Sequence, residues 1–391
     1  MTLPLIITIC ALILIAYVFD ITSRHTKVPT VIFLLVIGWV LKQLIAVFDL
    51  QVVNLMPLLP IFGTLGLILI VLEGGLELEV NKQKKPLIKK AVLSALFPLI
   101  ALATILSVSL HFFTGAKLID CLINVVPFCV ISSAIAIPSV QNLGREKKEQ
   151  VIYESSMSDI IGVVLFDFLI NNEVINLGSF VHFGIELAIM LVVSLIASIG
   201  LAFLIKKIEH HVKLVPIMMM IVLIYAVAKA YHLPALLFIL IFGLFLNNLD
   251  EFKQFSFIRY LKPKILDVEI HRFTRLVGEA AFLIRTIFFI LFGYSIDIND
   301  LFDLQALPYS IGIFVCVLLV RLVQLKITKE KLLPMLFIAP RGLITIMLFL
   351  SIPIGAKLTL VNEPMVLQLI ILSILVMMTG LVVNKEGKEI N

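Results

Sequence analysis

The chain has 391 residues and a formal net charge of +5, with 61% hydrophobic and only 15% charged residues. A soluble domain carries about 25% charged residues, so this composition excludes an ordinary soluble protein and predicts that most of the surface faces lipid. Unbroken apolar stretches such as Leu5 to Val18 also exclude a β-barrel, whose strands alternate in polarity. We therefore expect an all-α, polytopic membrane protein.

The first apolar run lacks a basic start and a cleavage site of small residues, so we interpret it as a retained span and not as a signal peptide. A span needs about 20 mostly apolar residues, which predicts about thirteen spans in this chain. The predicted spans are residues 3–20, 29–47, 57–76, 87–110, 119–141, 150–170, 182–205, 212–230, 234–249, 276–296, 307–326, 332–353 and 365–383. The basic segment 250–275, which contains Pro263, is expected to be an amphipathic connector in the cytoplasm.

Lysines and arginines gather in the loops that follow odd-numbered spans, whereas the even-numbered loops hold only Lys42, Lys117, Lys229 and Lys357. Because cytoplasmic loops carry the excess of basic residues, this alternation predicts an external N-terminus and a cytoplasmic C-terminus. The positive net charge follows this membrane pattern and needs no nucleic acid as a partner.

Thirteen spans of this orientation allow two sets of six helices in opposite orientation. The predicted repeats are residues 1–171 and 212–391, joined by a connecting span at 172–211. Gly, Pro and Ser interrupt the two equivalent spans, at Ser132 to Pro138 and at Ala339 to Gly342. We therefore expect two broken helices that cross at the core. Transporters built from inverted repeats have their binding site at such interrupted helices.

Ionisable residues inside spans are costly and mark functional sites. The string ESSMSD places Glu154, Ser155, Ser158 and Asp159 on the sixth predicted span, with Asp167 near its outer end. Asp159 would lie about 13 Å deep, at 1.5 Å per residue. It is the leading candidate for an ion-binding residue.

The remaining charges within spans are assigned by position. We expect Glu154 to form a structural ion pair with Arg341, because a guanidinium does not release its proton. Arg321 is expected to extend toward the cytoplasmic interface. Glu73 closes the third span beside a Gly-Gly pair, and Arg285, in the middle of the tenth span, could neutralise one of the acids.

These features together resemble the monovalent cation:proton antiporter superfamily, which includes the sodium/proton exchangers. ESSMSD is similar to the family's Glu-Ser-x-x-Asn-Asp motif, and the string with Glu73 resembles its acid followed by Gly-Leu-Glu. Arg341-Gly342 resembles the Arg-Gly of the second broken helix, and Phe288 through Gly293 to Asp297 resembles the tenth helix. The similarity extends over essentially the whole chain.

The resemblance implies a role for each matching position. Asp159 would hold either a cation or protons, with Ser155 and Glu73 as further ligands of the metal cation and with Ser132 and Ser133 at the break of the fifth span. The family also implies a homodimer in the cell membrane, with a mobile core and a dimerisation scaffold. Ser158 stands where the family usually has Asn, and the family's usual Thr-Asp-Pro in the first broken helix is absent. The absence of Thr-Asp-Pro resembles the potassium-efflux branch. The two departures leave open which cation is transported.

We therefore expect a secondary antiporter that exchanges Na⁺ or K⁺ for protons, electroneutrally because it has one deep aspartate, and that needs no cofactor. A cation- or proton-coupled symporter of an organic solute and a potassium efflux protein are the alternatives. An enzyme is not expected, since no nucleophile–base set or metal cluster lies in a span.

Overall fold

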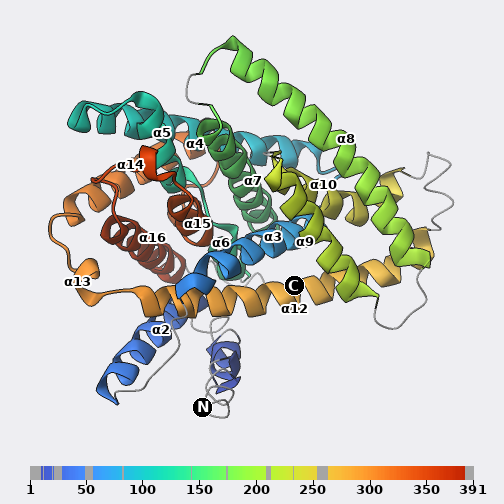
Figure 1. Ribbon diagram of the computed structural model, residues 1–391, viewed down its shortest axis with the longest axis horizontal. Helices are drawn as coiled ribbons and strands as arrows, with labels where there is room; N and C mark the ends of the chain where they lie inside the picture. Colours follow the sequence, from blue (N-terminus) through green and yellow to red (C-terminus); the bar gives the residue numbers. More distant parts are fainter. Residues whose placement is uncertain are drawn as a thin grey trace.

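The computed structural model describes residues 10–383 except 12, 20, 22–28, 49–55, 82, 142, 173–174, 208–212, 232 and 253–262. The described chain folds into helices and contains no β-strand, which confirms the predicted all-α class (Figure 1). The helices are α2 (Thr30–Val47), α3 (Leu59–Glu77), α4 (Lys85–Thr114), α5 (Leu118–Cys129), α6 (Ser133–Ser139), α7 (Arg145–Ile170), α8 (Leu177–Lys207), α9 (Leu214–Ala230), α10 (Ala235–Asn247), α12 (Pro263–Ser295), α13 (Ile298–Leu301), α14 (Leu307–Ile327), α15 (Leu343–Leu350) and α16 (Glu363–Val383).

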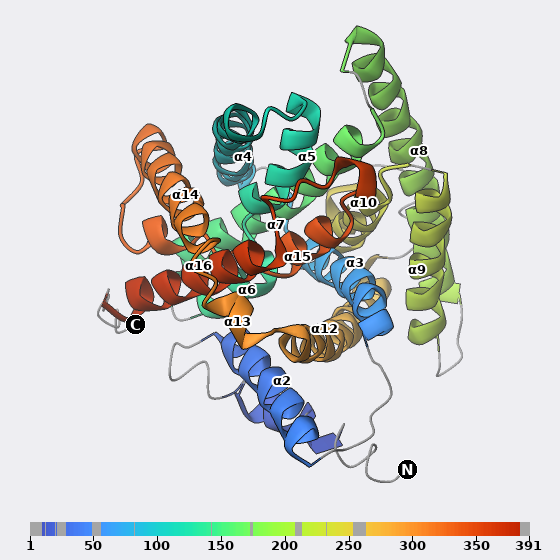
Figure 2. The same cartoon turned by 60° about the vertical axis from the view of Figure 1, so that its left-hand side comes forward.

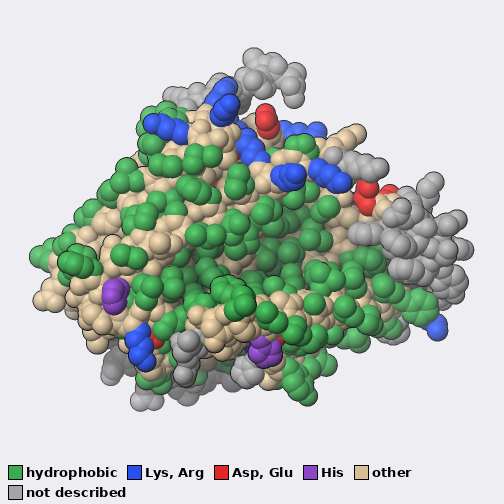
Figure 3. Space-filling model, turned by 90° about the horizontal axis from the view of Figure 1, so that it is seen from above, with side chains coloured by type: hydrophobic (Ala, Val, Ile, Leu, Met, Phe, Trp, Pro, Cys, Tyr) green, Lys and Arg blue, Asp and Glu red, His purple; other side chains and the backbone are tan. Residues whose placement is uncertain are grey.

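Eight helical segments in the described part of the chain are long and apolar enough to cross a membrane, and α9 and α10 are apolar but shorter. α7 falls outside this set because its span carries Glu154, Asp159 and Asp167. The predicted first span, residues 3–20, lies partly outside the described residues. Within this span, residues 13–19 are described and helical. Lysine and arginine side chains gather along one edge of the face in Figure 3, and hydrophobic side chains cover most of the rest.

The helices pack in two groups, which in Figure 2 lie toward the upper left (with α14 and α4) and along the right and bottom (with α9 and α2). The α12 group contains α2, α3, α8, α9, α10 and α12, and the α7 group contains α4–α7 and α14–α16. α3 and α10 contact α7 across the boundary, and α15 contacts α3. The described helices therefore form two packed bodies, joined where α3 and α10 contact α7 and where α15 contacts α3.

Glycines bring helices of the α12 group into backbone contact. A Cβ atom at Gly293 of α12 would lie 2.3 Å from the backbone oxygen of Leu35 on α2. A Cβ atom at Gly75 of α3 would lie 3.2 Å from the Cα atom of Gly243 on α10. Small residues allow such close approach in membranes, where packing drives helix association.

The expectation for α12 is wrong at its N-terminal end. The predicted span began at residue 276 after a connector at 250–275, whereas the helix begins at Pro263. Proline favours the first turn of a helix because its fixed φ suits that position and its missing N–H is not needed there. The charged residues of this stretch kept it out of the predicted span but do not prevent helix formation outside the apolar layer. Residues 253–262 of the predicted connector lie outside the described residues.

Both predicted helix breaks are present, but the first lies earlier than expected, because most of the predicted stretch from Ser132 to Pro138 forms α6. Residues 130–132 separate α5 from α6, and residues 338–342 separate a short 3₁₀ turn (Met335–Phe337) from α15. Pro340 within the second break has no N–H to donate to a helix. The two breaks meet, because the Ser132 N–H donates a 2.9 Å hydrogen bond to the Pro340 carbonyl oxygen. The crossing of the two broken helices lies against α7 and positions the candidate site.

Candidate functional site

The break after α5 frees backbone N–H groups, and α7 satisfies two of them. The Ile131 N–H donates to the Ser158 hydroxyl oxygen at 2.9 Å. The Ser133 N–H donates to the Asp159 carboxylate oxygen Oδ2 at 3.2 Å. An unpaired N–H away from water costs several kcal/mol. Ser158 and Asp159 therefore fix the broken helix to α7, and this gives Ser158, a possible site residue from sequence, a structural role.

The Asp159 carboxylate is 2% exposed and has one occupied and one free oxygen. Its Oδ2 also accepts a short hydrogen bond from the Ser133 hydroxyl. Its Oδ1 is buried without a hydrogen-bond partner among the described residues, as is the hydroxyl oxygen of the fully buried Ser132. Buried polar atoms are nearly always paired in folded proteins, so two orphaned oxygens in one break need an explanation.

Two further serines of α7 lie near Asp159. Ser155, one turn earlier on the same helix face, donates its hydroxyl to the Val151 carbonyl at 2.7 Å. This bond uses the hydroxyl hydrogen, so the lone pairs of the Ser155 hydroxyl oxygen remain able to bind a cation or to accept a hydrogen bond. Ser156 is a residue that sequence reasoning missed. Its hydroxyl is buried and unpartnered in the described structure and lies 3.2 Å from where a Cβ atom of Gly74 would be, on α3.

The Glu73 side chain lies against α12. A Cβ atom at Gly278 would be 3.3 Å from the Glu73 oxygen Oε1, and the charge of Arg285, two turns further along α12, acts on the Glu73 carboxylate. The structure thus brings Ser133 and Asp159 together, and it places Glu73 near Arg285 between α3 and α12, within the α12 group.

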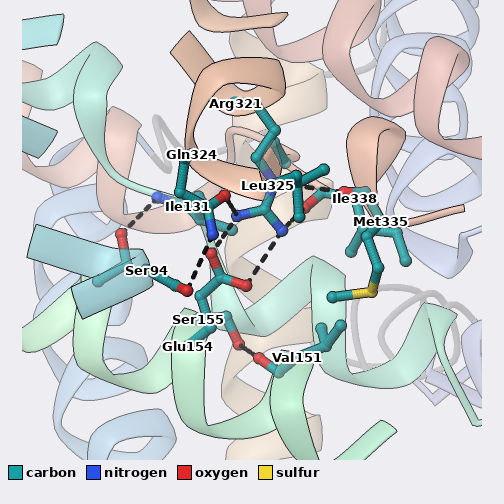
Figure 4. Close-up of polar contacts among 12 residues, drawn as sticks. Ser94, Ile131, Val151, Glu154, Ser155, Arg321, Gln324, Leu325, Met335 and Ile338 are labelled. Carbon is teal, nitrogen blue, oxygen red and sulfur yellow. Dashed lines mark hydrogen bonds and ion pairs between the residues drawn. The ribbon is translucent and has the colours of Figure 1, made fainter. Parts of the chain in front are cut away.

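The predicted ion pair between Glu154 and Arg341 is wrong. Glu154 pairs with Arg321 of α14, whose Nη2 donates to Oε2 at 3.0 Å and whose Nη1 donates a short bond to Oε1 (Figure 4). Both side chains are 2% exposed, so Arg321 does not extend to the interface as expected. Gln324 accepts from the same guanidinium at 3.0 Å and donates to Ser94 of α4 at 2.8 Å. This network ties α7, α14 and α4 into one body.

Arg341 instead stabilises the backbone of the breaks. Its Nε donates to the Phe128 carbonyl at 2.6 Å, and its Nη1 donates to the Ala339 carbonyl at 2.8 Å. Phe128 lies in the last turn of α5, where carbonyls lack partners within the helix and carry partial negative charge. The Arg341 N–H is held in turn by the Ser373 hydroxyl of α16 at 3.0 Å.

A sequence signal for the correct pair exists on α14. Arg321, Gln324 and Thr328 recur at helical spacing and form one polar face. An arginine that reaches the interface alone does not require a glutamine one turn away. The polar stripe therefore favours an inward orientation of Arg321.

Asp167 has a partner that sequence reasoning assigned to a loop. Lys229, in the last turn of α9, lies 2.6 Å from the Asp167 oxygen Oδ1. The Lys229 side chain is 48% exposed, so this pair contributes at most about 1 kcal/mol to stability.

The model of the transmembrane sodium/hydrogen exchanger family matches residues 10–384. A structure of the sodium proton antiporter MjNhaP1 from Methanocaldococcus jannaschii at pH 8 superposes with a TM-score of 0.69 at 15% identity, covering 96% of this chain and 95% of that one. An electron-microscopy structure of the same antiporter gives 0.70 at 16% identity, covering 98% and 96%. The search of curated proteins found no match.

Proposed function

This chain belongs to the sodium/hydrogen exchanger family of membrane transporters and is not an enzyme, and we propose that it exchanges one sodium or potassium ion for one proton at Asp159. Exchange of a monovalent cation for protons agrees with the family and with the antiporter fold. The proposed working form is a homodimer in the cell membrane, with the N-terminus outside and the C-terminus in the cytoplasm.

The free oxygens at the helix crossing carry this proposal. Asp159 Oδ1 and the Ser132 hydroxyl oxygen are both buried and unpartnered in the described structure. Hard cations prefer oxygen ligands, and a carboxylate with a hydroxyl supplies them. Ser133 holds the other carboxylate oxygen, which orients Asp159 for a ligand at Oδ1.

Exchange requires that the cation and the proton compete for Asp159 and that the empty site does not cross the membrane. A protonated carboxyl has lost the charge that attracts a cation, and a bound cation excludes the proton. If only the loaded site crosses between the two sides, each outward cation is balanced by one inward proton or the reverse. One cation for one proton moves no net charge, because a single deep carboxylate takes part.

Ser155 and Glu73 are proposed as auxiliary ligands. Ser155 shares a helix face with Asp159 and keeps acceptor capacity at its hydroxyl. Glu73 rests against α12 beside Arg285, so it would have to turn from that helix to reach a cation at Asp159.

Purified protein in liposomes with a trapped pH dye tests the function. A gradient of sodium, potassium or lithium should drive proton movement for at least one cation in wild type and for none in Asp159→Asn. The rate should not respond to an imposed membrane potential. A response to potential would contradict the one-to-one cycle, and proton movement that requires an organic solute would favour a symporter instead. Proton-independent potassium flux would favour an efflux protein.

A further inference from the structure

The three residues after α3 form an extended segment, Leu78–Val80, that we call the strap. Its backbone groups point alternately to two sides. On one side, the Val80 N–H donates to Asn248 Oδ1 at 2.6 Å, and Asn248 Nδ2 donates to the Leu78 carbonyl at 2.9 Å. On the other side, the Tyr153 hydroxyl donates to the Glu79 carbonyl at 2.7 Å and accepts from the Glu79 N–H at 3.1 Å.

These two sides belong to different bodies. Asn248 ends α10 in the α12 group, and Tyr153 lies in α7 of the α7 group. Asn247 adds a third bond from α10, donating to the Leu78 carbonyl at 3.1 Å. The strap is therefore a hydrogen-bonded bridge between the two bodies, in addition to being the covalent connection from α3 to α4.

The charged side chains beside the strap make a weaker link. Lys84 lies 2.9 Å from Glu79 and 3.5 Å from Glu149 at the start of α7. The Glu79 side chain is 57% exposed, and exposed pairs contribute about 0–1 kcal/mol and weaken in salt. Tyr153 is 4% exposed, so its hydroxyl bonds are the stronger attachment of the strap to α7.

Another connection between the groups is attached differently. Residues 296–306 join α12 to α14, and Gln368 of α16 donates to the Asp303 carbonyl at 2.9 Å while its Oε1 accepts from Ser310 of α14 at 2.9 Å. α14 and α16 both belong to the α7 group. At its other end, Lys42 of α2 donates to the Ile296 carbonyl at 2.9 Å. Each end of this connection is therefore bonded to its own body, whereas the three consecutive residues of the strap are bonded to both bodies at once.

We propose that Tyr153 is a positioning residue for transport, which through the strap holds α7 and its Asp159 in place against α10. Asp159 lies six residues further along the same helix, about 9 Å away at 1.5 Å per residue. The inference rests on the proposed exchange at Asp159. The bonds of the strap stabilise the arrangement of the two bodies in this structure, and they break when α7 shifts relative to α10.

The test compares three variants with wild type in liposomes: Tyr153→Phe, the α10-side variant that carries both Asn247→Ala and Asn248→Ala, and the combination of the two. Tyr153→Phe removes only the hydroxyl, so the apparent cation constant should stay within about two-fold of wild type. Turnover should rise about five-fold, because α7 no longer has to break these hydrogen bonds in order to shift. A five-fold change in rate corresponds to about 1 kcal/mol, the usual contribution of a hydrogen bond. The combined variant should be no faster than the faster of the two one-sided variants, because releasing either side already uncouples the bodies. Tyr231→Phe, at an exposed tyrosine of the α9 terminus, is the matched control and should not change turnover.

Hydrogen exchange of the Glu79 amide in detergent gives an independent readout. It should accelerate in Tyr153→Phe and stay as in wild type in Tyr231→Phe. Three results would overturn the proposal. The first is unchanged protection of the Glu79 amide in Tyr153→Phe, and the second is a changed cation constant with unchanged turnover. The third is a turnover in the combined variant that equals the product of the separate increases. A wild-type protein without any cation–proton exchange would instead refute the proposed function, and the Glu79 amide would still report whether Tyr153 holds the strap.

Discussion

The Arg321 guanidinium on α14 donates hydrogen bonds to both carboxylate oxygens of Glu154 on α7, and both side chains are buried. Glu154 lies five residues before Asp159 on the same helix. The pair therefore anchors the helix that carries the proposed transport carboxylate, while Asp159 Oδ1 has no hydrogen-bond partner in the part of the chain that the structure describes. Glu154 therefore serves the structure of α7, whereas Asp159 is the carboxylate proposed for ion binding.

Arg321→Met should lower thermal stability in detergent and folded yield. Breaking a buried ion pair costs about 3–5 kcal/mol, because the remaining charge is left without a partner. Arg272→Met is the matched control, since Arg272 pairs with Glu269 but is 67% exposed, and its loss should cost at most about 1 kcal/mol. Equal melting temperatures for the two variants would contradict a structural role for Arg321.

Glu154→Gln should partly restore the stability of Arg321→Met, because it removes the charge that was left unpaired. The same substitution should not restore Arg341→Met. Melting curves of the two double variants distinguish the partners of Glu154. Rescue of Arg341→Met alone would mean that Glu154 pairs with Arg341 after all.

Arg341→Lys should reduce stability even though the charge is kept. The guanidinium bonds two carbonyls, of Phe128 and Ala339, from different nitrogen atoms in a fixed planar geometry that an ammonium does not reproduce. The expected loss is about 1–3 kcal/mol, the usual cost of a buried acceptor left without a donor. Thermal melting of Arg341→Lys at the level of wild type would show that the carbonyl bonds contribute little.

The sequence predicted the helices and both breaks because their causes are local. Apolar runs of span length dictate helices in lipid, and Pro340 interrupts one of them. The position of Arg321 near the end of its span favours an interfacial side chain, and only the polar stripe that it forms with Gln324 and Thr328 indicates that it turns inward. Which acid it then meets depends on how α14 packs against α7, and span periodicity does not give that packing. The start of α12 at Pro263 was missed because charged residues outside the lipid layer resemble a loop in hydropathy.

Ser132→Ala should weaken cation binding without lowering stability. Its hydroxyl oxygen makes no hydrogen bond in the described structure, so folding loses little when it is removed, whereas the proposed site loses one ligand. We expect the apparent cation constant in liposomes to rise several-fold. Ser139→Ala, which removes a hydroxyl bonded within α6 itself, serves as control and should leave this constant unchanged. An unchanged constant in Ser132→Ala would exclude Ser132 as a ligand.

Glu73→Gln and Arg285→Gln should change the apparent cation constant in opposite directions. The first removes the charge of an auxiliary ligand and should raise the constant without abolishing exchange. The second removes the cation that acts on Glu73 and should lower it. Titration of sodium- and potassium-driven exchange in each variant measures both effects. Two variants that both match wild type would restrict the site to α7 and the helix crossing.

The competition between protons and cations at Asp159 is tested most directly by the apparent cation constant as a function of pH in liposomes. We predict that a higher proton concentration on the cation side raises this constant while the maximal rate at saturating cation is preserved. Asp159→Asn, whose amide neither carries charge nor takes up a proton at ordinary pH, should show no cation-driven proton movement. A cation constant that is independent of pH in wild type, or near-normal exchange by Asp159→Asn, would contradict a single shared site.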